Sequence, residues 1–292
     1  MDERVPFRHV DVFADEPYRG NGLIVMFCRT LDYTVGQLRT VAEEMRQFET
    51  IFVGTDGDSR AVAARIFTVE EELPFAGHPV IGAASALHER LAPDSDSIEW
   101  TFVIAGRSVP VVSRRDTEYF SAIMDQGRPV FAATVDHLRH QFAGALNLAP
   151  EHLAPLPLQV VSTGLPYLIV PVTADGLRRA RIIAPTFDQQ LADVGAKFVY
   201  VLDTQRREGR TWDNAGAVED VATGSAAGPA AAYLHERALL GRDEPLHLRQ
   251  GRFLGRSSTI TVTSDYQGHL WVGGPVRPVA GGQLDAVPRW SA

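Results

Sequence analysis

Two alanine-rich helical windows constrain the fold of this chain more than any other feature. HPVIGAASALHERL begins at His78 and SAAGPAAAYLHERALL begins at Ser225, and both carry Ala or Gly on nearly every face near their starts. A helix without a polar face is expected to be buried all round. Because small side chains let a sheet approach from several directions, each window is most simply a helix wrapped by its own strongly curved sheet. The sequence therefore predicts two similar units.

The order of the remaining segments favours a duplicated chain. Short β-rich segments such as RIFTV and YLIVPV recur through both halves. One fixed shift along the sequence aligns three pairs of positions, which are Glu72 with Glu219, Gly77 with Gly224 and His78 with Ser225. We expect an N-terminal lobe over residues 1–126 and a C-terminal lobe over residues 127–292. Residues 35–45 show the apolar spacing of an amphipathic surface helix.

Composition limits the partners and the compartment. The net charge is −8 and no basic stripe exists, which argues against nucleic acid as a partner. The start MDERVPF lacks the features of a signal peptide, and the longest apolar stretch, LIVMFC, is far shorter than the roughly 20 residues that span a bilayer. We therefore expect a cytoplasmic protein with a small-molecule substrate and no membrane partner.

Cysteine and histidine usage gives no metal signal. Cys28 is the only cysteine, so no disulfide can form within the chain, and we expect it to be a small core residue. The histidines show no HExxH spacing, and nothing in the sequence suggests a third ligand for the pair His137 and His140. We predict no metal site.

The segment QFETIFV places a carboxylate in an apolar strand. Alternate side chains of a strand share a face, so Glu49 points the same way as Ile51 and Val53. One interpretation is a glutamate at a strand end that pairs with an arginine. The other is a buried carboxyl group whose neutral form is favoured by desolvation, which suits it to general acid/base catalysis. The sequence leaves both interpretations open.

Each alanine-rich window begins with a polar residue and is preceded by a glycine. Gly77 and Gly224 are expected to supply turns, and Ser225 has the residue type of an N-cap. The N–H groups at such helix starts bind anions, so two of them across a cleft could hold a carboxylate or an enolate-like charge. The alternative for His78 is a plain helix cap. Asp220 lies five residues before Ser225, where a loop could bring its carboxylate beside the helix start, although it could equally be a solvated turn residue.

Taken together, these segments resemble a known family. HVDVFADEPYRGNG, QFETIFV, ELPFAGHPVIG, VSTGLPYLIVPV, EDVATGSAAG and QGRFLGRSSTITV follow one another as in the phenazine-biosynthesis (PhzF-like) isomerases, from His9 to about Val279. The resemblance implies an α+β, diaminopimelate epimerase-like fold with two pseudo-symmetric lobes, each a barrel-like sheet around a central helix. It also implies an active site between the lobes, no cofactor and a homodimer.

The family motifs assign roles to individual residues. By resemblance, Glu49, His78 and Asp220 are the catalytic residues, and Gly77, Gly224 and Ser225 bind the substrate. The expected reaction is a prototropic shift on a small unsaturated amino or carboxylic acid in specialised-metabolite biosynthesis, of the phenazine or antibiotic kind, with Glu49 as the general acid/base.

The chain departs from the family pattern beside two of these residues. Phe48 replaces a small hydroxyl residue and Val221 replaces a proline. The resemblance therefore does not identify the native substrate. Two alternatives remain. One is a catalytically inactive member that acts as a binding protein. The other keeps the fold but ends in epimerisation or carbon–carbon bond cleavage.

Overall fold

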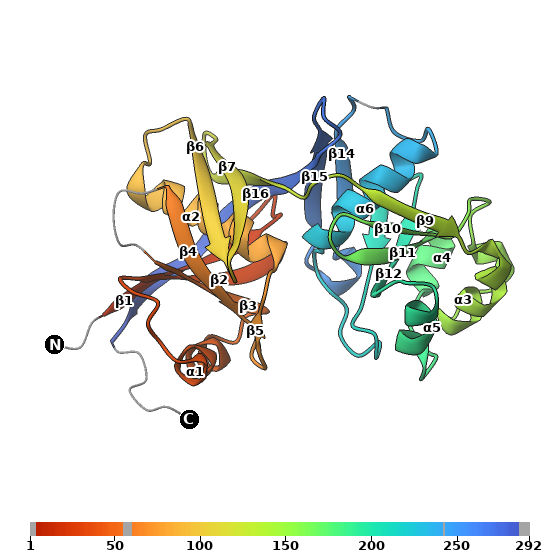
Figure 1. Ribbon diagram of the computed structural model, residues 1–292, viewed down its shortest axis with the longest axis horizontal. Coiled ribbons are helices and arrows are strands. Elements are labelled where there is room, and N and C mark those ends of the chain that lie inside the picture. The colour runs from red at the N-terminus through yellow and green to blue at the C-terminus, as the bar shows by residue number, and fades with distance from the viewer. Residues whose placement is uncertain (1–3, 55–59, 242, 286–292) are drawn as a thin grey trace. The chain divides into compact units, whose positions relative to one another are not determined.

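The computed structural model describes residues 4–54, 60–241 and 243–285. The chain divides into two compact units (Figure 1). Unit 1 takes the chain up to Asp125 and again from Gly273, and unit 2 is Gln126–Val272. The first boundary lies one residue from the expected one. The last strand begins in unit 2 at Leu270 and belongs to unit 1 from Gly273 on, whereas we expected all of it in the C-terminal lobe.

Unit 1 is a closed barrel. Its strands, in sheet order, are β1 (Val5–Val12), β2 (Asn21–Cys28), β3 (Glu49–Gly54), β4 (Ala61–Phe67), β6 (Ser97–Ile104), β7 (Arg107–Arg115), β8 (Phe120–Asp125) and β16 (Leu270–Leu284). The barrel closes where β16 pairs with β1 in antiparallel register, with a bulge between His9 and Val10. The short β5 (Glu72–Leu73) pairs with β4. Closure removes the open sheet edges that would otherwise attract another chain.

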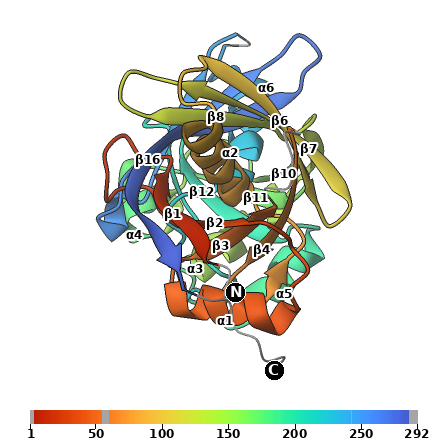
Figure 2. The ribbon, with the colours of Figure 1, turned by 90° about the vertical axis from the view of Figure 1, so that its left-hand side faces the viewer.

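The central helix α2 (Gly77–Leu91) fills this barrel (Figure 2). Every residue from Gly77 to His88 is buried, which confirms the all-round burial expected from its composition. Gly82 shows why small residues are needed, since a Cβ there would lie 2.4 Å from Cδ2 of Leu23. The strands can approach the helix this closely only because the side chain is absent.

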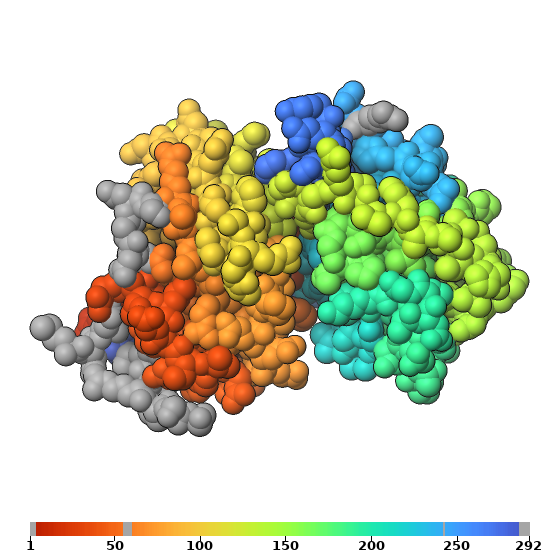
Figure 3. Space-filling view, in the orientation of Figure 1, coloured from red at the N-terminus to blue at the C-terminus, as the bar shows by residue number. Residues whose placement is uncertain are grey.

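Helix α1 (Val35–Met45) lies on the outside of unit 1 (Figure 3). Thr34 and Gln37 form a capping box at its start, and Leu38, Val41 and Ala42 are its buried face. The amphipathic surface helix predicted over these residues is confirmed. Its buried face packs with Cys28, which is a buried core residue as expected.

Unit 2 is a curved sheet around a second helix. Its strands, in sheet order, are β9 (Val130–Thr134), β10 (Gln159–Ser162), β11 (Pro166–Val172), β12 (Phe198–Asp203), β13 (Glu208–Arg210), β14 (Leu246–Gln250) and β15 (Ser258–Ser264). Helix α6 (Gly224–Glu236) packs against β10, β11, β12 and β15. Its residues from Ala226 to Leu234 are buried, as predicted for the second alanine-rich window.

Both faces of the middle strands of unit 2 are covered. Leu168 and Val170 join a core with three short helices, α3 (Arg139–Ala145), α4 (Ala174–Arg179) and α5 (Phe187–Asp193). Successive side chains of a strand point to opposite faces, so Tyr167 and Tyr200 lie on the face toward α6. These two tyrosines bring hydroxyl groups to the start of α6.

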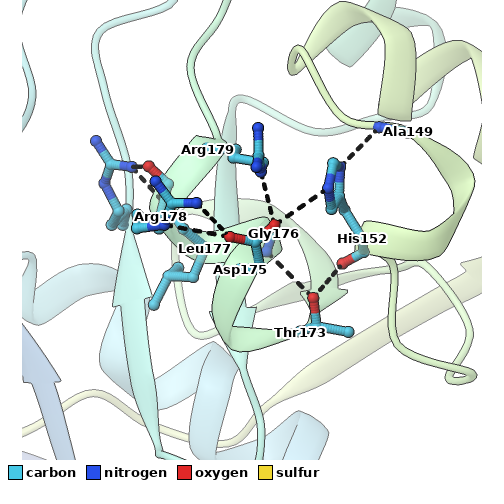
Figure 4. A network of polar contacts seen from close by, with 9 residues as sticks. Ala149, His152, Thr173, Asp175, Gly176, Leu177, Arg178 and Arg179 are labelled. Atoms are coloured by element: carbon cyan, nitrogen blue, oxygen red, sulfur yellow. Dashed lines mark hydrogen bonds and ion pairs between the residues drawn. The ribbon is translucent and has the colours of Figure 1, made fainter.

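A surface network joins the start of α4 to His152 (Figure 4). The Asp175 carboxylate accepts hydrogen bonds from Arg178 and Arg179, and one of its oxygens lies 3.4 Å from Nε2 of His152. Hydrogen bonds from Arg179 and Arg178 lower the pKa of Asp175 to about 2. Thr173 caps the helix by accepting from the backbone N–H of Gly176 at 3.1 Å. The start of the helix is therefore capped and tied to the segment that carries His152.

No helix in the described ranges is long and apolar enough to cross a membrane.

Candidate active site

Glu49 and His78 meet inside unit 1. Glu49 is the first residue of β3 and pairs in register with Leu23, while His78 is the second residue of α2. Nε2 of His78 lies 2.9 Å from Oε2 of Glu49, and the two side chains are 7% and 8% exposed. Glu49 is buried, as the second interpretation requires, and the side chain beside its carboxylate is this histidine rather than an arginine.

His78 is not a helix cap. The N-cap of α2 is Ala76, whose side chain accepts no hydrogen bond, and His78 lies within the first turn with its ring turned to Glu49. A carboxylate and an imidazole at hydrogen-bond distance can share one proton, and burial keeps water from competing for it. The two atoms therefore lie close enough for a proton to pass between the side chains. Phe48, the neighbour of Glu49, is 45% exposed.

Asp220 is the centre of a polar network in unit 2. The Thr223 hydroxyl donates to Oδ2 of Asp220 at 2.6 Å. Nε2 of Gln250 donates to the Asp220 carbonyl and to the Thr223 hydroxyl, each at 2.9 Å. The Tyr200 hydroxyl in turn donates to Oε1 of Gln250 at 3.0 Å. Because Gln250 and Tyr200 are buried, Asp220 is held by the core of unit 2 and is more than a solvated turn residue.

The expectation that Ser225 is an N-cap is wrong. The N-cap of α6 is Thr223, and Ser225 is the second helical residue. Its hydroxyl lies 2.7 Å from the Tyr167 hydroxyl on β11. Burial raises the pKa of Tyr167, so the phenol stays protonated and can donate to Ser225. Ser225 is thus fixed from the sheet, a contact that the local sequence does not reveal.

Gly77 and Gly224 are the first residues of α2 and α6. Neither has a positive φ, so the turn that we expected of each does not depend on the left-handed conformation. At Gly77 a Cβ would lie 3.1 Å from Cε of Met124, a tight contact that a small shift of this flexible side chain would relieve. Neither N-cap side chain accepts a backbone hydrogen bond. In α6 the Ala226 N–H donates to the Thr223 carbonyl at 3.1 Å, so the N–H groups of the first two residues of each helix are the ones that could bind an anion.

The structure groups the expected residues unit by unit. Unit 1 brings Glu49, His78 and Gly77 together, and unit 2 brings Asp220, Gly224 and Ser225 together. That the two groups act on one substrate stays a prediction. In the described residues no cluster of three His, Cys, Asp or Glu side chains could hold a metal ion.

Sequence reasoning missed the residues that hold the second group. They are Thr223, Gln250, Tyr167 and Tyr200. Two features of the sequence could have indicated them. One is a tyrosine within each of two apolar strands, and the other is the glutamine that begins QGRFLGRSS.

Comparisons with known proteins agree with this architecture. A family model for phenazine biosynthesis-like proteins matches residues 10–272. An uncharacterized isomerase, YddE, from Salmonella typhimurium is 32% identical over 268 residues, which cover 87% of this chain and 88% of that protein. A trans-2,3-dihydro-3-hydroxyanthranilate isomerase from Pseudomonas aeruginosa is 30% identical over 272 residues, which cover 89% of this chain and 90% of that protein.

A solved structure shows the same fold. It is that of a predicted epimerase from Pseudomonas aeruginosa, with a TM-score of 0.88 and 48% identity, covering 97% of this chain and 99% of that chain. The diaminopimelate epimerase-like α+β fold expected from the resemblance is confirmed. The chain belongs to the phenazine biosynthesis-like (PhzF) family and is a PhzF-like isomerase.

Proposed function

We propose that this isomerase moves a proton within a small unsaturated amino or carboxylic acid, with Glu49 as the general acid/base. The observation that carries the proposal is the buried contact of 2.9 Å between Glu49 and His78. Carboxylates in such surroundings are strong enough bases to take a proton from carbon beside a conjugated system. The relative from Pseudomonas aeruginosa, named for a dihydro-hydroxyanthranilate, supports this substrate class.

The proposed reaction is balanced within the substrate. The Glu49 carboxylate takes a proton from a carbon next to the diene, and the electron pair of that C–H bond enters the conjugated system. A double bond shifts, and Glu49 returns the proton to a carbon at the other end of the system. Nothing is oxidised or reduced. His78 shares the proton with Glu49 between the two transfers.

The groups of unit 2, together with the start of α2 in unit 1, have a different role in this proposal. Ser225 and the N–H groups that open α2 and α6 stabilise the carboxylate and the charge that develops on the substrate. Donors of this kind are typically worth a few kcal/mol each in a transition state. Asp220, fixed by Thr223 and Gln250, orients the polar substituents of the substrate.

The test uses trans-2,3-dihydro-3-hydroxyanthranilate in heavy water. Wild-type protein is expected to give a product with deuterium at the carbon that gains the proton, seen by NMR. Glu49→Gln should lower turnover by about 10²- to 10⁴-fold, the usual contribution of a general base. The matched control is Glu70→Gln, at an exposed position of unit 1. A Glu49→Gln protein with wild-type turnover would show that another group is the base.

A second outcome has one observation in its favour, because the solved structure at 48% identity is described as a predicted epimerase. Epimerisation would leave deuterium on the carbon that lost the proton and invert its configuration. The same NMR experiment separates the two outcomes by the position of the label.

A further inference from the structure

The two units contain the same arginine–glutamate contact. In unit 2, Nε and Nη2 of Arg210 donate to the two carboxylate oxygens of Glu219 at 2.8 and 2.7 Å. In unit 1, Nε and Nη2 of Arg65 donate to the two oxygens of Glu72, both at 2.7 Å. We call these contacts the unit 2 clasp and the unit 1 clasp.

The two clasps share more than the pair of charges. An aromatic residue, Phe67 or Trp212, lies two positions after each arginine. It pairs with the clasp glutamate in antiparallel register, as Phe67 with Glu72 and as Trp212 with Glu219. Each guanidinium also lies over that ring, at 5.3 Å for Phe67 and 4.7 Å for Trp212. This repetition of a whole local structure shows that the clasps are equivalent parts of the duplicated chain.

Each clasp lies at the same distance from a helix start. Gly77 follows Glu72 by five residues, and Gly224 follows Glu219 by five residues. The intervening segment in unit 2 contains Asp220, whose backbone N–H donates to the Thr211 carbonyl at 3.1 Å. In unit 1 the segment leads to His78. The clasps therefore fix the two segments that carry the candidate catalytic groups.

The arginines join these segments to rigid parts of each unit. Arg210 also donates to the carbonyls of Leu177 and Ala180, at 2.8 and 3.0 Å, at the end of the helix drawn in Figure 4. Arg65 donates to the Tyr33 carbonyl at 2.6 Å, just before α1. The unit 2 clasp is the more buried, with side chains 10% and 9% exposed, against 21% and 31% in unit 1.

We propose, on the basis of the function given above, that Arg210, Glu219, Arg65 and Glu72 are positioning residues for the active site. A buried ion pair often stabilises a fold no better than apolar residues would, because desolvation offsets the attraction. A two-pronged arginine–carboxylate contact does fix geometry. The clasps thus set where the helix starts, Asp220 and His78 lie, and each acts through the segment that follows its glutamate.

The test replaces each arginine by lysine, which keeps the charge but cannot form the two-pronged contact. Arg210→Lys and Arg65→Lys are compared with one matched control. Arg8 contacts Glu89 in unit 1 with the same two-pronged geometry. Glu89 does not precede a helix start. Glu219→Gln is the second variant for the unit 2 clasp.

The first readout is amide hydrogen exchange on the full chain, which needs no substrate. Arg210→Lys and Glu219→Gln should speed exchange about tenfold in residues 220–224, and Arg65→Lys should do so more weakly in residues 72–78, since its clasp is more exposed. Arg8→Lys should leave hydrogen exchange in both segments unchanged. Equal exchange in these segments for the clasp and control variants would overturn the proposal.

The second readout is turnover of trans-2,3-dihydro-3-hydroxyanthranilate. The clasp variants should lose about tenfold or more in kcat, because misplaced catalytic groups slow the chemical step, and the loss in kcat should exceed any rise in KM. If the wild type does not convert this compound, the proposed substrate class is wrong. Hydrogen exchange would still test whether the clasps fix the two segments. If the wild type converts it and the clasp variants, despite faster exchange, do so equally well, the positioning role is refuted.

Discussion

Nε2 of His78, on the first turn of α2, and Oε2 of Glu49, at the start of β3, lie 2.9 Å apart in the interior of unit 1. The contact joins the central helix of the barrel to one of its strands. Because both side chains are more than nine-tenths buried, a proton between them is shielded from bulk water. This relationship underlies the proposed chemistry.

His78→Gln should lower kcat about 10²-fold, because the amide can donate to Glu49 but cannot take up the shared proton. Steady-state kinetics on trans-2,3-dihydro-3-hydroxyanthranilate measure the loss. The control is His247→Gln, at an exposed position of β14. Unchanged turnover in His78→Gln would assign this histidine a purely structural role.

Tyr167→Phe should destabilise the protein by about 1 kcal/mol, because it removes one buried hydrogen bond and leaves the Ser225 hydroxyl without this partner. Urea unfolding measures the change in free energy. KM for the substrate should rise in the same variant, since Ser225 is no longer fixed. Tyr266→Phe, at a side chain that is 95% exposed, is the control and should change neither quantity.

Gly82→Ala should destabilise the protein by about 1–3 kcal/mol, because the new Cβ would lie 2.4 Å from Cδ2 of Leu23 and 2.9 Å from Cγ2 of Val12. Gly144→Ala is the matched control in a helix. No atom lies within 4 Å of its Cβ position, so alanine should stabilise α3 by up to about 1 kcal/mol. Thermal unfolding of both variants should show shifts of opposite sign. Equal shifts would contradict close packing around α2.

The folded protein should become less stable at acidic pH because His88 takes up a proton. Burial is the main cause that lowers its pKa below the ordinary 6.5. Its Nε2 lies 2.9 Å from the Ser95 carbonyl and its Nδ1 lies 2.8 Å from the Ser113 hydroxyl, contacts that suit the neutral ring. Since the unfolded chain takes up a proton at a higher pH than the folded one, the contribution of His88 is complete above about pH 6.5 and is lost as the pH falls toward the lowered value.

The measurement is thermal unfolding of wild type and His88→Gln at about pH 7.5 and about pH 5.5. The loss of stability between the two pH values should be smaller in the variant. An identical loss in both proteins would show that His88 does not contribute to the acid sensitivity.

Much of the fold could be predicted from local patterns. Small residues on every face identified α2 and α6 as central helices, and helical spacing identified α1. Strand alternation placed Glu49 on a buried face. These predictions hold because the spacing of apolar residues along a helix or strand shows which of its faces is buried.

The candidate site was less predictable because its contacts join distant segments. The sequence does not show which side chain lies beside Glu49. His78 lies there because the barrel of unit 1 encloses the start of α2. The fixed shift that aligns Glu72 with Glu219 does not align the two clasp arginines, because the arginine and the glutamate are farther apart in unit 2 than in unit 1. The sequence comparison therefore did not identify the clasps.

The sequence by itself determined that the chain has two similar units with central helices, and which residues resemble a catalytic set. Only the tertiary structure decided that β16 closes the barrel of unit 1, that Ser225 bonds to Tyr167, and that Asp220 is held by Gln250. The physical reason is that local periodicity reports which faces are buried, whereas the partner of a buried polar group depends on where the rest of the chain passes.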